Sequence, residues 1–201
     1  MKKIEIEEIK DIADYEKIRK GFRNKIIEMK NARRVKVGDM ITLTFENRYT
    51  VTFQIEEMMR IERIVDDEKI KSEIETYNEL IPKENELSAT FFVEVDEQDK
   101  IKPVLDSLVG LNKDSVFLQI GEHKIPAVFE EGHATDDRIS AVQYVRFRLS
   151  PEETKALINL LVPVRIIIKH KNYNAETAIP QVTQKALAED MTHGTSANVW
   201  N

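Results

Sequence analysis

The sequence contains no cysteine, and this absence excludes several kinds of chemistry. Without cysteine there is no disulfide framework, no thiolate zinc site, no cysteine nucleophile and no protein-ligated iron–sulfur cluster. Glycine is scarce, with six residues, and neither a Walker loop nor a Rossmann fingerprint is present. No apolar run approaches the roughly 20 residues of a membrane-spanning helix, and residues 1–10 alternate acidic and basic side chains. We therefore expect a cytoplasmic protein that does not insert into membranes.

The residues that are present predict a folded chain of ordinary composition. Hydrophobic residues make up 41% of the 201 positions and charged residues 33%, which supplies enough apolar surface for a core. We expect a single domain over 1–201 with a flexible tail at 194–201. A seam at 82–86 is the best place for a division between a helix-rich part (1–82) and a strand-rich part (86–193).

Local periodicity predicts the order of the elements. Apolar residues three or four positions apart predict helices over 8–33, 56–81, 100–109 and 178–189. The segment 56–81 is either one long helix or two helices with a joint at 66–67. Alternating residues predict strands over 87–95, 139–149 and 164–168, and a β-hairpin over 116–129 turning at Gly121-Glu122. Ser150, Pro151 and Glu153 are typical of a helix start. This mixed order predicts an α+β fold with mixed or antiparallel sheet.

A second β-hairpin is predicted over 41–55. Ile41, Leu43 and Phe45 alternate with threonines, and alternation resumes from Tyr49 to Ile55 after an interruption. The interruption is Glu46-Asn47-Arg48, and asparagine tolerates the positive φ of a tight turn. We therefore expect these three polar residues at the tip of a hairpin.

Charge is distributed unevenly along the chain, whose formal net charge is -6. Between positions 19 and 36, Glu28 is the only acid among eight cations: Arg19, Lys20, Arg23, Lys25, Lys30, Arg33, Arg34 and Lys36. One interpretation is a surface network in which the arginines pair with Glu46, Glu56, Glu57 or Glu62. The other is a site for an anionic small molecule or an acidic protein, formed by Arg19, Arg23, Arg33 and Arg34 with the 46–48 turn. Extended nucleic acid is not expected, because the remainder of the chain is acidic.

A second group of polar residues lies on the strand predicted over 139–149. Tyr144, Arg146 and Arg148 share one face of that strand, which is either an exposed face paired with acids or the floor of a groove. An enzyme hypothesis therefore competes with the binding hypothesis. In it, a pocket of Arg48, Glu56, Gln143, Tyr144 and Arg146 acts on an anionic small molecule.

No motif predicts a metal or cofactor site. The chain has no Glu-x-x-His pair of the kind that di-iron bundles use. His133 has Glu130, Glu131, Asp136 and Asp137 nearby, a composition that is most often simply polar. We expect no cofactor and no stoichiometric transition metal.

Two stretches carry a family resemblance. They are Arg33 to Met58, with its Phe-Glu-Asn-Arg segment at 45–48, and Arg138 to Phe147, with its Ala-Val-Gln-Tyr segment at 141–144. The chain resembles, from Tyr15 to about Glu189, the bacterial family catalogued as domain of unknown function 3501. The resemblance implies no activity or residue role. It does imply a genomic setting near rubrerythrin-like and iron–sulfur proteins, hence a link to oxidative stress and a partner of that kind. The leading hypothesis is a binding or accessory protein rather than an enzyme.

Overall fold

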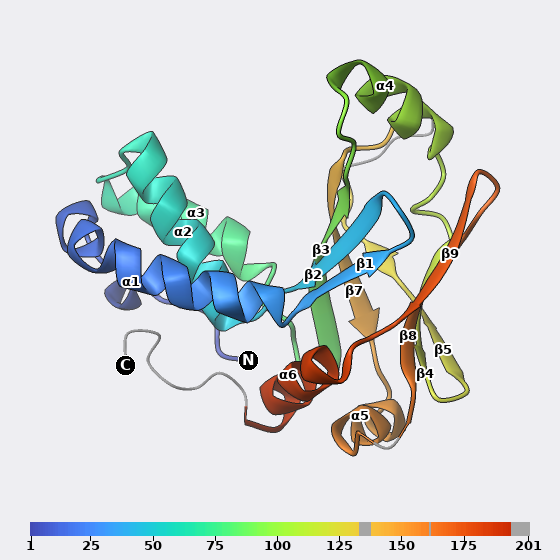
Figure 1. The fold of residues 1–201 in the computed structure, drawn as a ribbon. Helices are drawn as coiled ribbons and strands as arrows, with labels where there is room; N and C mark the ends of the chain where they lie inside the picture. Colours follow the sequence, from blue (N-terminus) through green and yellow to red (C-terminus); the bar gives the residue numbers. More distant parts are fainter. Residues whose placement is uncertain (133–137, 161, 194–201) are drawn as a thin grey trace.

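The computed structural model describes residues 1–132, 138–160 and 162–193. The tail predicted at 194–201, and most of the His133 cluster, lie outside these residues. The described chain forms an α+β fold, as predicted, and its strands form two antiparallel sheets (Figure 1). The five-stranded sheet has the order β1 (Arg34–Val37), β2 (Ile41–Phe45), β3 (Glu86–Val93), β7 (Val142–Arg148), β6 (Val128–Phe129). The four-stranded sheet has the order β5 (His123–Pro126), β4 (Val116–Ile120), β8 (Val164–His170), β9 (Tyr173–Ala178).

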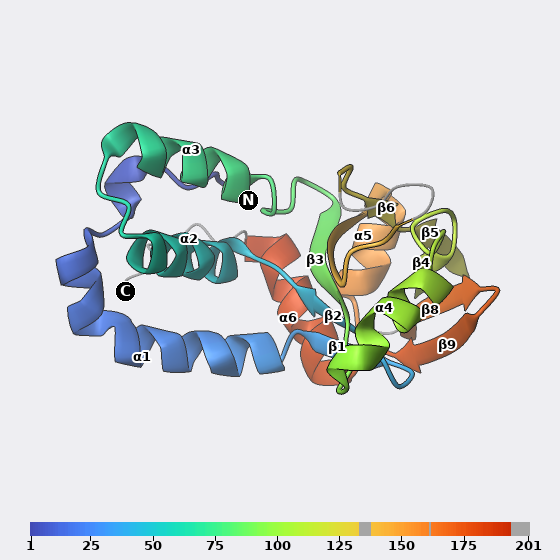
Figure 2. The same ribbon diagram turned by 90° about the horizontal axis from the view of Figure 1, so that it is seen from above.

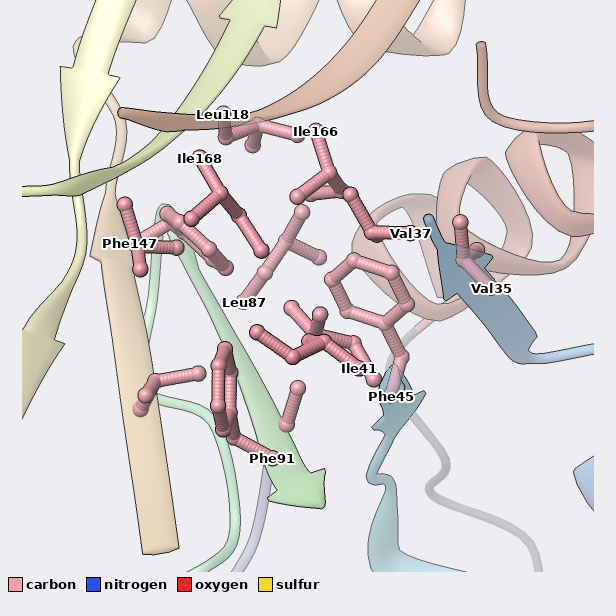
Figure 3. Close-up of a cluster of buried hydrophobic side chains, with 14 of the residues drawn as sticks. Val35, Val37, Ile41, Phe45, Leu87, Phe91, Leu118, Phe147, Ile166 and Ile168 are labelled. Atoms are coloured by element: carbon pink, nitrogen blue, oxygen red, sulfur yellow. The ribbon is translucent and has the colours of Figure 1, made fainter. Parts of the chain in front are cut away.

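The main core lies between the two sheets. Every second residue of a strand points to one face, so Phe45, Phe91 and Phe147 of one sheet meet Leu118 and Ile166 of the other (Figure 3). All five side chains are fully buried. Burial of each such side chain stabilises the fold by roughly 1.5–3 kcal/mol.

The N-terminal helices form a separate layer beside the sheets. η1 (Ile6–Glu8), α1 (Ile12–Asn31), α2 (Arg48–Glu62) and α3 (Asp67–Asn78) have two small apolar clusters of their own (Figure 2). α4 (Gln98–Ser107) lies at one end of the sheets, and α5 (Pro151–Ile158) and α6 (Gln181–His193) lie at the other (Figure 1). No described helix is long and apolar enough to cross a membrane.

The hairpin predicted over 41–55 is wrong: the chain leaves β2 and enters α2 at Arg48. Asn47 has an extended backbone, with φ -145°, and its side chain accepts hydrogen bonds from the backbone N–H groups of Tyr49 and Thr50. Asparagine here is therefore a helix N-cap and not a turn residue. The alternation from Tyr49 to Ile55 coexists with a helical stripe, because Val51 and Ile55 are four positions apart and both are fully buried.

The hairpin that does form lies one element earlier. β1 and β2 pair antiparallel through a turn at Gly38, whose φ is 72°. A Cβ at this position would lie 2.2 Å from the Tyr173 hydroxyl oxygen, so only glycine fits. That hydroxyl donates to the Val37 carbonyl at 2.6 Å and connects β9 to β1 across the edge of the two sheets.

Most other elements agree with the sequence. β4 and β5 form the hairpin predicted over 116–129, and the helix joint at 66–67 separates α2 from α3. Ser150 and Glu153 form the predicted capping box of α5. β1 and β9 were not predicted. The segment 82–86 connects α3 to β3, although β1 and β2 place part of the N-terminal half in the five-stranded sheet.

Candidate functional site

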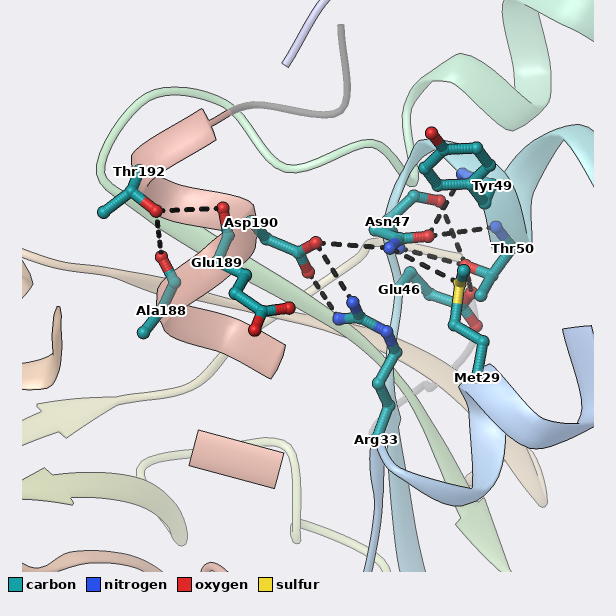
Figure 4. A network of polar contacts seen from close by, with 10 residues as sticks. All are labelled: Met29, Arg33, Glu46, Asn47, Tyr49, Thr50, Ala188, Glu189, Asp190 and Thr192. Atoms are coloured by element: carbon teal, nitrogen blue, oxygen red, sulfur yellow. Dashed lines mark hydrogen bonds and ion pairs between the residues drawn. The ribbon is translucent and has the colours of Figure 1, made fainter. Parts of the chain in front are cut away.

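A buried ion pair connects three distant parts of the chain. The Arg33 guanidinium, just after α1, donates from both Nη atoms to the Asp190 carboxylate of α6, with Nη2 to Oδ1 at 3.0 Å (Figure 4). Asn47 donates to the same Oδ1 at 3.3 Å while its own oxygen caps α2. Burial raises the pKa of Asp190, and the charge and hydrogen bonds of Arg33 oppose that rise. The pair therefore fixes α6 against the β2–α2 junction.

Glu46 lies at the same junction and is 4% exposed. Thr90 donates its hydroxyl to Oε1 at 2.6 Å, and Thr50 and Gln54 donate to Oε2. All three donors are neutral, and no described cation forms an ion pair with Glu46. A buried carboxylate without a cationic partner is costly to desolvate, and Glu46 is one such group in this fold.

Two cavities meet at Glu46. One has a volume of 200 Å³ and is bordered by α1, β1 and the polar face of the five-stranded sheet; it is lined by Lys30, Asn31, Arg34, Thr44, Glu46, Phe92 and Glu94. The other has a volume of 360 Å³ and extends toward α5 and α6. A third cavity, of 260 Å³, lies away from Glu46 between η1, α2 and α3, and isoleucines dominate its lining.

Most arginines of the predicted cation cluster have acidic partners. Arg19 forms a two-pronged ion pair with Glu57, at 2.7 and 2.9 Å, and Tyr15 donates to the same carboxylate at 2.7 Å. Led by the Arg19 hydrogen bonds, these contacts lower the pKa of Glu57 to about 2. Arg34 pairs with Glu94, which directly follows β3.

Arg48 and Glu56 face the N-terminal segment that crosses α2. Arg48 is 2% exposed, donates to the Lys2 carbonyl at 3.1 Å and pairs with Glu8 at 2.5 Å. Glu56 is 1% exposed and accepts from the Lys10 backbone N–H at 2.9 Å. Burial raises the pKa of Glu56 to about 7. Both residues therefore hold residues 2–10 in place.

The residues of the predicted enzyme pocket face different environments. Gln143 pairs with Phe91 and points to the core between the sheets, with both amide atoms unpartnered. Tyr144 and Arg146 point to the opposite face, where Arg146 donates to Glu86 at 2.8 Å. Neither these residues nor Arg48 and Glu56 line the three cavities above. None of these three cavities is therefore the pocket that the enzyme hypothesis predicted.

One flank of α1 keeps its cations unpaired. Lys20, Arg23 and Lys30 have no ion-pair partner among the described residues, and Lys30 lies 6.0 Å from the centre of the Phe53 ring. Together with Ile27, which is 41% exposed, they follow one stripe at spacings of three, four and three. We call Lys20, Arg23, Ile27 and Lys30 the cationic flank.

Residues important to this region were missed in the sequence. Asp190 lies 157 positions from Arg33, so no local pattern connects them. One signal was present, because Asp190 follows Leu187 by three positions and therefore occupies the buried stripe of α6. A charged residue on such a stripe predicts a buried partner. Among the described residues, no cluster of three or more acids and histidines could hold a metal.

Comparison with known proteins gives a family and a fold. The family model described as "protein of unknown function (DUF3501)" matches residues 3–191. A crystal structure of a protein of unknown function from Burkholderia pseudomallei K96243 is similar, with a TM-score of 0.88 and 28% identity. The similarity covers 94% of this chain and 100% of that one. No curated protein matches the sequence.

Proposed function

Since the chain belongs to the DUF3501 family, whose description names no activity, we propose from its own surface that it is a binding protein for an acidic protein partner. The contact is the cationic flank of α1. The observation that carries this proposal is the contrast between Arg19, Arg33 and Arg34, which have acidic partners, and the flank, which has none among the described residues. Unpaired cations on an acidic protein create a local positive potential that attracts negative surfaces.

The shape of the flank favours a protein over a small anion. Ten positions separate Lys20 from Lys30, which corresponds to about 15 Å along the helix axis. Small molecules bind in concave sites, whereas Lys20, Arg23 and Ile27 lie on the exposed side of the helix, and of the four residues Lys30 alone lines a described cavity. Ile27 adds exposed apolar surface between the charges, as protein interfaces commonly do.

The family resemblance suggests the first partners to test. Its implied genomic setting makes a rubrerythrin-like or iron–sulfur protein with an acidic surface the natural choice. In such a complex this chain would be the accessory subunit, because the described residues hold no metal-binding cluster of their own.

The test reverses the charges of the flank. We expect Lys20→Glu, Arg23→Glu and Lys30→Glu together to weaken partner binding by about 100-fold or more, mainly by slowing association. Binding by the unaltered protein should weaken as salt increases from about 50 to 500 mM, because exposed charges are screened. Surface plasmon resonance measures both effects.

A matched control changes the same number of charges elsewhere. Lys155, Lys171 and Lys185 are exposed and have no ion-pair partner among the described residues, so their reversal to Glu shifts the net charge equally. If the control variant loses binding as much as the flank variant, net charge and not the flank determines recognition, and the proposal is wrong.

A further inference from the structure

The larger cavity beside Glu46 has the dimensions of a ligand site. Its volume of 360 Å³ falls in the range of about 300–1,000 Å³ that is typical of small-molecule pockets, whereas the other two described cavities fall below it. We call it the Glu46 cavity. It is lined by Met1, Glu46, Pro82, Lys83, Glu84, Asn85, Glu86, Leu87, Thr154, Asp190 and Met191.

Three buried carboxylates line this cavity, and they differ in how they are neutralised. Asp190 pairs with Arg33, and Glu86 pairs with Arg146 at 2.8 Å. Glu46 has hydrogen bonds from neutral groups alone. The two arginine pairs leave Glu46 as the buried carboxylate of this wall without an ion pair among the described residues. Met1 and Lys83 also line the cavity, but the Met1 ammonium donates to the Pro82 carbonyl at 3.3 Å and Lys83 is exposed.

The cavity wall also contains a hydroxyl group that has no hydrogen-bond partner. The Thr154 hydroxyl of α5 is buried and makes no hydrogen bond, although Thr154 lines the cavity. A buried hydroxyl without a partner costs free energy, and a ligand group that bonds to it recovers that cost. This observation is independent of the carboxylates, because Thr154 contacts none of them through a hydrogen bond.

We infer that the Glu46 cavity binds a small organic cation, with a primary ammonium or guanidinium group donating to Glu46 and a polar group reaching Thr154. Such a group supplies a charge-assisted hydrogen bond, which is shorter and stronger than a bond between neutral groups. Pro82, Leu87 and Met191 line the same cavity, and such apolar residues suit a short alkyl chain. A metal ion fits less well, since the described carboxylates and histidines form no cluster of three.

The test uses 1,4-diaminobutane and agmatine as probes, and 1,4-butanediol as a neutral analogue of the same length. We expect both amines to shift the backbone amide resonances of Glu46, Thr90 and Leu87 in a saturable way, and the diol to leave them unchanged. Titration to about 10 mM detects even a Kd near 1 mM. Absence of saturable shifts, or equal shifts with the diol, overturns the inference.

Variants locate the binding group. Glu46→Gln keeps an acceptor for the Thr90 hydroxyl but removes the charge, and should weaken amine binding at least about tenfold. Glu56→Gln is the matched control, because Glu56 is an equally buried glutamate outside the cavity, and it should bind amines normally. Undiminished binding by Glu46→Gln contradicts the inference.

A second variant decides the matter if Glu46→Gln does not fold. Thr154→Val preserves the shape of the side chain and removes a hydroxyl that has no partner, so the fold should not suffer. We expect weaker amine binding by several-fold, and unchanged binding rejects the site. The cationic flank lies on α1, so failure here leaves the proposed partner surface untouched.

Discussion

Glu56 should make the stability of this protein fall as the pH rises through the weakly acidic range. Its carboxyl is buried in α2 beneath the N-terminal segment, and the pKa is raised from 4.5 to about 7, chiefly by burial. The Lys10 N–H opposes that effect, while Asp11 and Glu57 add to it. Since the folded state holds the proton more tightly than the unfolded chain, folding is most favourable when Glu56 is protonated.

The magnitude follows from the two pKa values. Below pH 4.5 both states are protonated, and above about pH 7 neither is. Between these limits the free energy of unfolding decreases by about 3 kcal/mol, at 1.36 kcal/mol for each pKa unit. Glu56→Gln cannot ionise and still offers an oxygen to the Lys10 N–H, so it should be more stable than the unaltered protein at pH 8 by up to about 3 kcal/mol.

Urea unfolding at pH 5, 6, 7 and 8 measures this difference. Other groups titrate identically in both proteins, so the difference in unfolding free energy between Glu56→Gln and the unaltered chain isolates Glu56. We expect the difference to grow with pH and to level off above about pH 7. A difference that stays constant from pH 5 to 8 would refute the argument.

The neighbouring residue provides a control of opposite sign. Arg19 and Tyr15 lower the pKa of Glu57 to about 2, so its ionised form stabilises the fold above pH 4.5, and that contribution is lost as the pH falls toward 2. Glu57→Gln should therefore destabilise the protein at pH 7. Because solvent reaches part of this side chain, we expect about 1–2 kcal/mol. Stabilisation by both substitutions would show that burial alone, and not the partners, decides the sign.

The sequence predicted those elements whose pattern has a single period. α1 has one helical stripe, and the capping box at Ser150 leaves no alternative to a helix start. The α2 segment is different, because Tyr49, Val51, Phe53 and Ile55 satisfy a strand and a helix at once. The N-cap at Asn47 decides in favour of the helix. The Asn47 side chain accepts from the Thr50 backbone N–H, and the Thr50 side chain accepts from the Asn47 backbone N–H. Asparagine is common both at helix N-caps and in tight turns, so the residue by itself predicts either structure.

Other features were beyond the sequence because they depend on tertiary contacts. β9 alternates only weakly, with Tyr173 and Ala175 between Asn174 and Glu176, and it exists as the edge partner of β8. Glu46 was predicted as a site residue, but at a hairpin tip and not at the wall of two cavities. Its donor Thr90 lies 44 positions away, and the pairing of β2 with β3 brings the two together.

Two further substitutions test contacts between distant elements: the Arg33 ion pair with α6, and the contact of the β1–β2 turn with β9. Arg33→Ala leaves the buried carboxylate of Asp190 without its cation. We expect the free energy of unfolding, measured with urea, to fall by about 3–5 kcal/mol. A decrease below about 1 kcal/mol, which is typical of an exposed ion pair, would contradict this expectation. Gly38→Ala combines a left-handed backbone, φ 72°, with a Cβ only 2.2 Å from the Tyr173 hydroxyl oxygen. Gly110→Ala has the same backbone strain, at φ 92°, but meets no atom within 4 Å. Because both variants carry the strain of about 1–3 kcal/mol and only Gly38→Ala adds the collision, it should be the less stable of the two. Equal unfolding free energies would mean that the turn relaxes away from Tyr173 without cost, and that this hydroxyl does not fix the β1–β2 hairpin against β9.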